Sequence, residues 1–488
     1  MPPEILRHII DGTPRPSETG KSIPIVSPLT GNVSHEIARG GPVEANLAVK
    51  SSRVAGETWR KVPRHERSEI LRHISKNILD HREDLARQIV SEVGKPLREA
   101  RIEVERAASV FSMSADAVRH ETGRSYPADA YPYPPGNERR MIWTRREPLG
   151  VVVAISPFNF PLNLLSHKVA PALAAGNTVV AKPASFGAGV GVALAGIALD
   201  SGLPPGVLNV VLGSGGEVGM SLVTHPAVRL VTLTGSVDTG RRVAERAGAG
   251  GKKVLLELGG MDPMIVFEDA PLDPAVDAAV RGTFAFSGQV CTATKRLLVA
   301  SPVLDRFLEA FSAKVAGLVV GDPTEESTQV GPIIDSDSVA RIEGMVADAT
   351  ERGAKLVLGG GRVRSELGPY YFAPTILSNV PGDARVVQEE PFGPLAPVQG
   401  FSDEEEAISL ANSTRYGLQA AIFTSDIGRA LRVARELQVG GVHINDPTTL
   451  RWDALPFGGS RASGWGREGV DSAIEEMSEI KLISLNSA

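Results

Sequence analysis

Between Val151 and Gly235, short apolar runs alternate with longer segments of helical character. The apolar runs are VVVAI, NTVVAKP, VLNVVLG and LVTLTG, and helices are predicted between the first of them over residues 162–175 and 189–201. Strands joined through helices predict a parallel, doubly wound α/β sheet, because parallel strands need a long crossover connection. Such a sheet gathers the carboxyl ends of its strands, and any bound ligand, along one edge.

A second alternation of this kind runs from about Glu257 to Gly441 and predicts a second α/β domain. Upstream of both, residues 64–103 carry Arg, Glu, Leu and Ile at spacings of three and four, which predicts amphipathic helix that serves as scaffold. In the second domain, strands are predicted at 264–267 and 296–299, and helices at 275–286, 303–319, 337–353 and 403–412.

The stretch GRSYPADAYPYPPGNERRMIWTRREPLG, residues 123–150, interrupts this organisation. Its Pro-Gly-Asn turn at 135–137 lies between extended, aromatic-bearing arms, which predicts a projecting hairpin that contacts another subunit. An ordinary surface loop fits its composition nearly as well. The C-terminal IKLISL alternates like a strand and could pair with the hairpin.

Composition excludes several classes of protein. The length of 488 residues suggests about three domains, and the net charge of −6 argues against a nucleic-acid partner. No apolar run approaches the ~18 residues that a transmembrane helix needs, and the N-terminus lacks an apolar run typical of a signal peptide. A single cysteine forbids an intrachain disulfide. We expect a cytoplasmic protein with no membrane partner.

That single cysteine, Cys291, lies in FSGQVCTA among small and polar residues. A lone cysteine is most often a small buried hydrophobe; the alternative is a nucleophile, which needs an oxyanion donor and a base. Asn159 lies in a turn stiffened by Pro157 and Pro161 and could donate its carboxamide, although it could equally cap the following helix. Glu257 ends an apolar strand and is either a desolvated general base or a paired structural carboxylate.

Two glycine-rich turns could bind phosphate. LTGSVDTG places Thr, Gly and Ser between a strand and a helix that begins near Val237, where free N–H groups suit a pyrophosphate. GSGGEVG, residues 213–219, is a second turn of this type, and Lys182 ends a nearby strand. Neither turn is the GxGxxG fingerprint in its usual place, and turn glycines are also needed for purely structural reasons.

The chain resembles the aldehyde dehydrogenase superfamily over almost its whole length. The resemblance rests on an ordered set of blocks: ISPFNFP, AGNTVVAKPA, LTGSVDTG, LELGG, FSGQVCTATKR, QEEPFGPL and PFGGSRASGWGREG. The local sequence is most similar to that of non-phosphorylating glyceraldehyde-3-phosphate dehydrogenases and lactaldehyde dehydrogenases. The implied parts are a dinucleotide-binding domain (1–123 and 148–257), a catalytic α/β domain (258–441), an oligomerisation hairpin and tail (124–147 and 471–488) and a returning segment that lines the substrate pocket (442–470).

The resemblance also implies residue roles. Cys291 is the expected nucleophile, Asn159 and the Cys291 backbone N–H form the oxyanion hole, and Glu257 activates water. Lys168 and Glu468 match a proton relay beside that glutamate. The expected cofactor is NADP or NAD, with no metal. The cofactor contacts are expected at Ser156, Pro157, Phe158, Lys182, Ala184, Ser185, Gly215, Thr234, Gly235, Ser236, Leu258, Glu390 and Phe392.

Two departures from the family pattern bear on specificity. Ser185 stands where many NAD-preferring relatives carry a glutamate that repels a 2′-phosphate, so we expect NADP to be accepted. Val290 stands where relatives that handle anionic aldehydes often carry arginine; Arg451 could substitute, but such a residue is more often a charge at the pocket rim. The other pocket candidates are Asn163, His167, Thr292, His443 and Phe457.

We therefore expect a homodimer or homotetramer that oxidises a small polar aldehyde, such as a hydroxyaldehyde, to its carboxylate. Two alternatives remain. An acylating enzyme would pass the thioester to coenzyme A, although such relatives commonly lack a glutamate at the position of Glu257. A binding protein on the same fold would have no catalytic use for Cys291.

Overall fold

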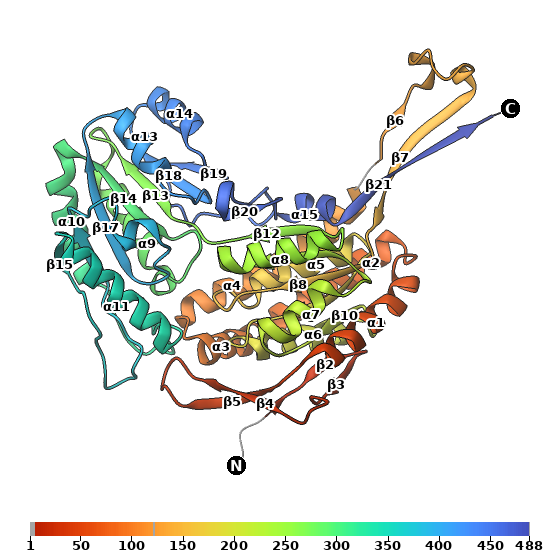
Figure 1. The fold of residues 1–488 in the computed structure, drawn as a ribbon, viewed down its shortest axis with the longest axis horizontal. Coiled ribbons are helices and arrows are strands. Elements are labelled where there is room, and N and C mark those ends of the chain that lie inside the picture. The colour runs from red at the N-terminus through yellow and green to blue at the C-terminus, as the bar shows by residue number, and fades with distance from the viewer. Residues whose placement is uncertain (1–4, 121–122, 488) are drawn as a thin grey trace.

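The computed structural model describes residues 5–120 and 123–487 and contains two large sheets, each flanked by helices (Figure 1). The first sheet has the strand order β3-β2-β10-β9-β8-β11-β12-β20, and its central strands are parallel, as predicted. Its strands are β2 (His8–Ile10), β3 (Thr13–Arg15), β8 (Val151–Ile155), β9 (Thr178–Lys182), β10 (Leu208–Val210), β11 (Val228–Thr234), β12 (Lys253–Glu257) and β20 (Gly464–Trp465).

Apolar residues on both faces of the central strands explain why helices cover both faces of this sheet. In β8, Val152 and Ala154 join one buried cluster, whereas Val151 and Val153 join the other. Side chains alternate between the two faces of a strand, so a continuous apolar run needs helices on both sides. The helices of this part are α1 (Pro42–Trp59), α2 (Arg64–Asp80), α3 (Arg82–Val93), α4 (Leu97–His120), α5 (Asn163–Ala174), α6 (Ala188–Asp200), α7 (Met220–Thr224) and α8 (Val237–Ala249).

The second sheet has the order β15-β16-β17-β14-β13-β18-β19 and is parallel except at β15. Its strands are β13 (Asp262–Val266), β14 (Thr294–Ala300), β15 (Lys355–Leu358), β16 (Thr375–Ser378), β17 (Leu395–Phe401), β18 (Gln419–Phe423) and β19 (Gly441–Ile444). Its helices are α9 (Leu272–Phe284), α10 (Leu304–Ala316), α11 (Ser336–Glu351), α12 (Arg385–Gln388), α13 (Glu404–Asn412) and α14 (Ile427–Glu436). A last helix, α15 (Val470–Glu476), follows β20 and packs against α5.

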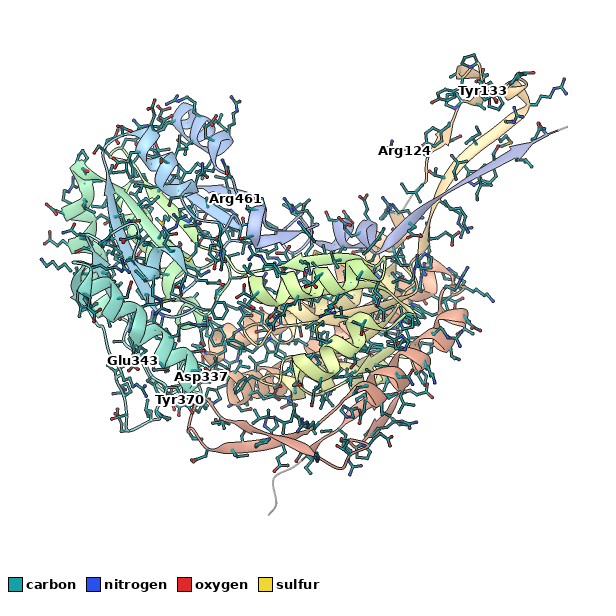
Figure 2. All side chains as sticks on the ribbon, in the orientation of Figure 1. Arg124, Tyr133, Asp337, Glu343, Tyr370 and Arg461 are labelled. Carbon is teal, nitrogen blue, oxygen red and sulfur yellow. The ribbon has the colours of Figure 1, made fainter. Side chains whose placement is uncertain are left out.

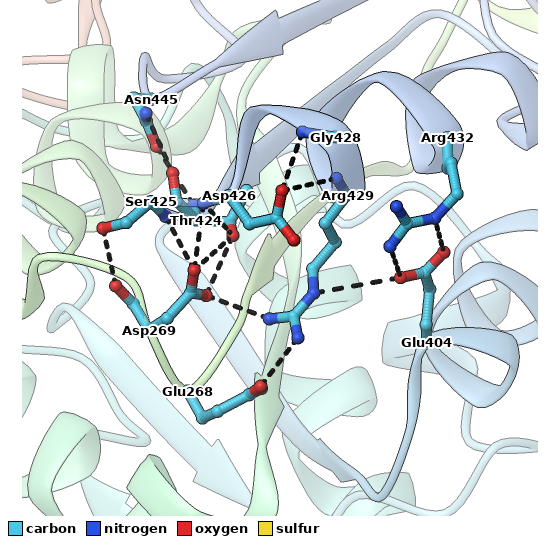
Figure 3. A network of polar contacts seen from close by, with 10 residues as sticks. All are labelled: Glu268, Asp269, Glu404, Thr424, Ser425, Asp426, Gly428, Arg429, Arg432 and Asn445. Atoms are coloured by element: carbon cyan, nitrogen blue, oxygen red, sulfur yellow. Dashed lines mark hydrogen bonds and ion pairs between the residues drawn. The ribbon is translucent and has the colours of Figure 1, made fainter.

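A polar network joins the ends of β13 and β18 to the start of α14 (Figure 3). The Asp269 carboxylate accepts hydrogen bonds from the Thr424 hydroxyl (2.8 Å) and from the Ser425 and Asp426 backbone N–H groups (both 3.0 Å). Arg429 adds bonds to Asp269 at 3.0 Å and to Glu268 at 2.9 Å. These bonds fix the loops at one end of the second sheet.

The predicted pairing of the C-terminal strand with the hairpin is confirmed. The strand β21 (Ser478–Asn486) runs antiparallel to β7 (Arg140–Pro148) over the full length of both, and β6 (Ser125–Tyr126) adds a short third strand. The first arm of the hairpin was expected to be extended, but beyond β6 it folds into short helical turns. The three strands project from the body, and Tyr133 lies near the tip (Figures 1 and 2).

Three expectations from the sequence need correction. The segment 64–103 is not one helix: α2 ends at Asp80, α3 ends at Val93 before the left-handed Gly94 (φ +71°), and α4 begins at Leu97. The predicted helix 275–286 ends at Phe284, and 303–319 ends at Ala316.

Several strands were not predicted. In the second sheet these are β15 to β19. Elsewhere they are β2 and β3 with β20 at the edges of the first sheet, and the small sheet of β1 (Ile5–Leu6), β4 (Ser22–Val26) and β5 (Val33–Ala38). The strands outside the second sheet are short and carry polar residues, so they lack the apolar runs that identify buried strands. Within the described residues, no helix is long and apolar enough to span a membrane.

Candidate active site

The loop that carries Cys291 begins with a tight left-handed turn. After α9, Phe286, Ser287 and Gly288 have φ values of +43°, +56° and +74°. A side chain at Gly288 would place its Cβ 2.1 Å from the Gly393 carbonyl oxygen, so only glycine fits. The Phe286 N–H is held by the Glu99 carboxylate of α4 at 3.2 Å. This turn ends the predicted helix early and brings Cys291 toward the first domain.

Cys291 is partly buried and its thiol is protonated at rest, because burial raises its pKa to about 12 although the nearby Lys295 ammonium opposes that shift. Lys295 also donates to the Cys291 carbonyl oxygen. Val290 is buried in the same apolar cluster as Phe286. Thr292 is also buried, and its carbonyl accepts the Thr448 hydroxyl at 2.7 Å.

Asn159 lies in the turn between β8 and α5 and faces the cysteine loop. Its Nδ2 donates to the Gln289 carbonyl oxygen at 2.9 Å, two residues before Cys291. The side chain is 2% exposed, and its Oδ1 has no partner. No side chain caps α5, so the alternative of a capping asparagine does not apply. The structure thus brings together two residues that are 132 positions apart in the chain, Asn159 and Cys291.

Glu257 ends β12 and is buried next to the same site. Burial, and then the negative charge of Glu468, raise its pKa well above the usual value. Its Oε1 has no hydrogen-bond partner and lies 2.8 Å from the position that a Cβ at Gly458 would occupy. Glu257 is not a paired structural carboxylate: it interacts electrostatically with the Cys291 thiol, and one oxygen remains available.

Lys168 and Glu468 form a fully buried ion pair beside Glu257. Lys168 Nζ lies 2.5 Å from Glu468 Oε1 and donates to the Thr234 hydroxyl at 2.8 Å. Arg451 Nη2 donates to the other Glu468 oxygen at 3.2 Å. Although burial opposes it, the charges of Lys168 and Arg451 lower the pKa of Glu468 to about 2. The two predicted relay residues are therefore in direct contact.

A cluster centred on Asp453 forms another wall of the site. Arg106 of α4 binds Asp453 through Nε (2.9 Å) and Nη2 (2.6 Å), and His167 Nε2 lies 2.9 Å from Asp453 Oδ1. Arg451, only 10% exposed, lies 3.7 Å from Asp453 and stacks over Phe457 at 3.9 Å. Arg451 is therefore not a rim charge. The interaction of Arg106 with the Cys291 thiol connects this cluster to the cysteine.

Sequence reasoning missed Arg106 and Asp453. Arg106 lies on a helix that was interpreted only as scaffold, and Asp453 is two residues from Arg451 in a loop whose register was uncertain. Arg106 follows Glu105 in an otherwise amphipathic helix, and these two residues belong to no motif that could have identified Arg106 as a site residue. His443 lies on β19, where it contacts Gln419 (3.1 Å) and faces Trp452.

A cavity of about 1130 Å³ opens beside β9 and α8, at one edge of the first sheet. Lys182 and Gly215, both predicted cofactor residues, line it together with Lys21, Arg39, Arg242 and Arg246, which were not predicted. Burial lowers the pKa of Lys182 to about 8, and its Nζ donates to the Pro183 carbonyl. Ser236 caps α8 by accepting the Thr239 N–H at 3.3 Å. Ala184 and Ser185 are half-buried beyond the end of β9.

The remaining predicted cofactor residues continue from this cavity toward Cys291. Glu390 pairs with Lys295 at 3.1 Å and accepts the Gly260 N–H at 3.3 Å, and Phe392 contacts Phe158 edge-to-face at 5.8 Å. The remaining members are buried or half-buried: Ser156, Pro157, Thr234, Gly235 and Leu258. The Ser156 hydroxyl has no partner. A dinucleotide that lies along this line would reach from the cavity to the cysteine.

Across the described part of the chain, no group of three or more His, Cys, Asp or Glu side chains is arranged to hold a metal ion.

Comparisons with known proteins agree with this geometry. The model of the aldehyde dehydrogenase family matches residues 15–483. Succinate-semialdehyde dehydrogenase [NADP(+)] GabD of Escherichia coli K12 is 40% identical over 98% of this chain and 97% of that protein. The lactaldehyde dehydrogenase of Methanocaldococcus jannaschii is 40% identical over 95% of this chain and 97% of that protein.

A crystal structure of an E. coli NADP-dependent enzyme superposes with a TM-score of 0.95 at 39% identity, covering 99% of this chain and 98% of that one. The likeness extends over all parts of the fold, from the N-terminal strands to the C-terminal arm. The chain therefore belongs to the aldehyde dehydrogenase family and is an oxidoreductase that acts on aldehydes with NAD or NADP.

Proposed function

We propose that the protein oxidises a small polar aldehyde to its carboxylate through a covalent intermediate on Cys291. The observation that supports this most directly is the convergence of three groups from different parts of the chain. Asn159 is bonded to the loop of Cys291, and Glu257 lies within electrostatic reach of the thiol with one oxygen unpartnered.

In the proposed first step, the Cys291 sulfur attacks the aldehyde carbon as its proton leaves. A C–S bond forms, the C=O π electrons move to oxygen, and the resulting oxyanion accepts hydrogen bonds from Asn159 Nδ2 and the Cys291 backbone N–H. The resting thiol is a poor nucleophile because of its raised pKa, so Glu257, whose Oε1 is available, is the proposed acceptor of its proton and passes it on before the second step. Bound NAD or NADP supplies a hydride acceptor, and loss of hydride from the tetrahedral carbon leaves a thioester.

Glu257 is the proposed base for the second step. Its available Oε1 takes a proton from water as the water oxygen attacks the thioester, and the C–S bond breaks to give the carboxylic acid and the thiolate. The proton of the acid passes to the thiolate, which releases the carboxylate and restores the resting thiol. Its raised pKa suits this role near neutral pH. Lys168 and Glu468, bonded to each other beside Glu257, provide a route by which that proton leaves the buried site.

The cofactor site supports acceptance of NADP. The cavity is lined by cations and glutamates, and Arg39 is paired with Glu217 at 2.6 Å. Lys182 has no acidic partner among the described side chains there and Ser185 lies three residues after it, so a 2′-phosphate near Lys182 would meet positive charge. Kinetics with NAD and NADP test this. We expect Ser185→Glu to raise the KM for NADP much more than that for NAD, whereas Ser185→Ala leaves their ratio nearly unchanged. Strong exclusion of NADP by the unaltered enzyme would reject the inference.

The function itself is tested by mixing the enzyme with a panel of small aldehydes and either cofactor. We expect a burst of one NAD(P)H per active site, a carboxylate product, and no burst in Cys291→Ala. Release of an acyl-CoA when coenzyme A is present, with no carboxylate in its absence, would instead indicate an acylating enzyme. No burst with any aldehyde would favour a binding protein.

We also propose that the arm of β6, β7 and β21 contacts another copy of this chain. Its surface carries exposed apolar side chains, among them Met141, Ile480 and Leu482, and such residues on a projecting sheet are typical of a subunit contact. Sedimentation of the full chain is expected to give a dimer or tetramer, and deletion of residues 478–487 is expected to give smaller species. A monomer at all concentrations would contradict this.

A further inference from the structure

The tautomer of His167 is determined by its contact with Asp453. The two side chains meet at 2.9 Å through His167 Nε2 and Asp453 Oδ1. Burial, and then the charge of Arg451, lower the pKa of His167 to about 4, so the ring is neutral. An ionised carboxylate can only accept, so Nε2 carries the single ring hydrogen and Nδ1 keeps a free lone pair.

Asp453 is held so that it cannot release His167. Arg106 binds it bidentately, at 2.9 and 2.6 Å, and Arg451 lies 3.7 Å from the same Oδ1 atom. Although burial opposes it, the bonds from His167 and Arg106 hold the pKa of Asp453 far below its usual range. The carboxylate therefore remains an acceptor throughout the working pH range, and the hydrogen remains on Nε2.

The lone pair at His167 Nδ1 has no partner among residues 5–120 and 123–487, although the side chain is only 1% exposed. Asn163 is four residues earlier on α5, so its side chain lies on the same helix face, and its buried Oδ1 also has no partner. Buried polar atoms are nearly always paired, so two adjacent unpaired acceptors indicate a ligand group that donates.

These acceptors belong to the reaction site. Arg451, which contacts the same Asp453 oxygen, also binds Glu468 beside the proposed base, and Arg106 lies within electrostatic range of Cys291. A donor on an aldehyde held at Cys291 would therefore approach the same group of side chains. Hydroxyl is the donor that a small, uncharged polar aldehyde most simply carries.

We propose that His167 Nδ1 accepts a hydrogen bond from a hydroxyl group of the aldehyde substrate, with Asn163 Oδ1 as a second acceptor. Arg106 and Asp453 are positioning residues, which act by keeping His167 in the tautomer that accepts. This proposal rests on the proposed function and extends it by naming the group that selects hydroxyaldehydes.

The test compares kcat/KM of the full-length enzyme for 2-hydroxypropanal, 3-hydroxypropanal, propanal and 2-fluoropropanal at saturating cofactor. Fluorine can accept but cannot donate, so the 2-fluoro compound should gain nothing from His167. We expect at least one hydroxyaldehyde to exceed propanal by about tenfold to a hundredfold, the size of one buried hydrogen bond that would otherwise go unpaired.

Matched variants then locate the effect. His167→Gln can keep the contact with Asp453 but has no atom at the Nδ1 position, so the preference for hydroxyl should disappear. His167→Asn places an oxygen near the Nδ1 position and should retain part of it. Asp453→Asn can donate to Nε2, which moves the ring hydrogen to Nδ1 and should also abolish the preference. His65→Gln, at an exposed position of α2, is the control and should leave the preference unchanged.

The outcomes separate this proposal from the proposed function. If no aldehyde gives an NAD(P)H burst, the proposed function fails. If all four aldehydes react alike in the unaltered enzyme, or if 2-fluoropropanal matches the hydroxyaldehyde, the proposal about His167 fails while the function stands. The second comparison needs no variant, so it decides the question even if a substitution in the cluster prevents folding.

Discussion

Two lysine–glutamate ion pairs are completely buried among the residues that the structure describes, and they differ in what surrounds them. Lys95 pairs with Glu103 at the start of α4, and Lys168 pairs with Glu468 between α5 and the C-terminal segment. All four side chains have no exposed surface. By burial and chemistry alone the two pairs cannot be distinguished.

The Lys95 pair is saturated. Glu103 accepts the backbone N–H groups of Leu162 and Asn163 with its second oxygen, at 2.9 and 3.2 Å. The Lys95 ammonium lies 3.5 Å from the centre of the Phe160 ring. These contacts occupy the pair and fix the turn that carries Asn159, so its role is structural.

The Lys168 pair is surrounded by groups that are not saturated. Glu257 Oε1 and Arg451 Nε, both adjacent to Glu468, have no hydrogen-bond partner. Two carboxylates that repel each other are kept together here, at an energetic cost that a purely structural site would avoid. The difference teaches that unpaired atoms next to an ion pair, and not the pair itself, identify the reactive region.

The largest expected effect is on stability. Lys95→Met leaves the Glu103 charge buried without a counterion and should lower the free energy of unfolding by about 3–5 kcal/mol, measured by urea denaturation. The double variant Lys95→Met/Glu103→Gln keeps an acceptor for the two N–H groups and should recover most of that loss. Equal stability of Lys95→Met and the unaltered enzyme would contradict the structural role of the Lys95 pair.

Asn159→Ala should lower turnover by ~10²–10³, because one donor to the oxyanion is lost. The dissociation constant of NADP should change little, since the side chain is bonded to Gln289 of the cysteine loop. Steady-state kinetics and cofactor titration measure the two quantities. Unchanged turnover would show that the turn fixed by the Lys95 pair does not serve the reaction.

Glu468→Gln should move the pH dependence of thioester hydrolysis to lower pH. The base must be unprotonated to act, so the rate rises as pH passes the pKa of Glu257, and the Glu468 charge raises that pKa. Removing that charge should shift the rising limb down by about one unit. Glu103→Gln, the matched change in the Lys95 pair, should leave the rising limb of the pH–rate profile in place. Equal shifts in the two variants would refute the distinction between a structural and a reactive ion pair.

The smallest expected effect concerns Glu92, whose pKa burial raises to about 7 but which is hydrogen-bonded by Gln88 and the Gly189 N–H. The pKa of Glu92 is higher in the folded protein than in the unfolded protein, so the contribution of the protonated carboxyl to the free energy of unfolding is complete below about pH 4.5. This contribution is lost as the pH rises through 7. Glu92→Gln should therefore remove this loss at pH 8 without changing turnover. A fall in turnover would mean that a buried carboxyl with a raised pKa can indicate a functional site even when it has no unpaired atom.

The sequence was sufficient to predict the two α/β sheets, because short runs rich in β-branched residues, such as VVVAI in β8, alternate with longer helical segments, and this alternation favours buried parallel strands. It also predicted the contact of β21 with β7. The nearness of Asn159 and Glu257 to Cys291 was implied by the family resemblance, because the residue pattern alone left a structural role open for each of them. The short edge strands β2 and β20 are specified by tertiary pairing and have no periodicity of their own. Arg106 and Asp453 could not be found, because their meeting depends on where α4 crosses a loop that is more than 300 residues away.

One face of α4 fixes the relative positions of three parts of the site. Glu99, Glu103 and Arg106, spaced by four and three residues, reach respectively the turn before Cys291, the turn after Asn159 and the Asp453 cluster. Deleting one residue between Glu99 and Arg106 would rotate the later part of the helix by about 100° and disconnect these contacts together. Changes of specificity are therefore expected to accumulate in the loops that this helix meets, while the helix itself accepts substitutions but not insertions or deletions.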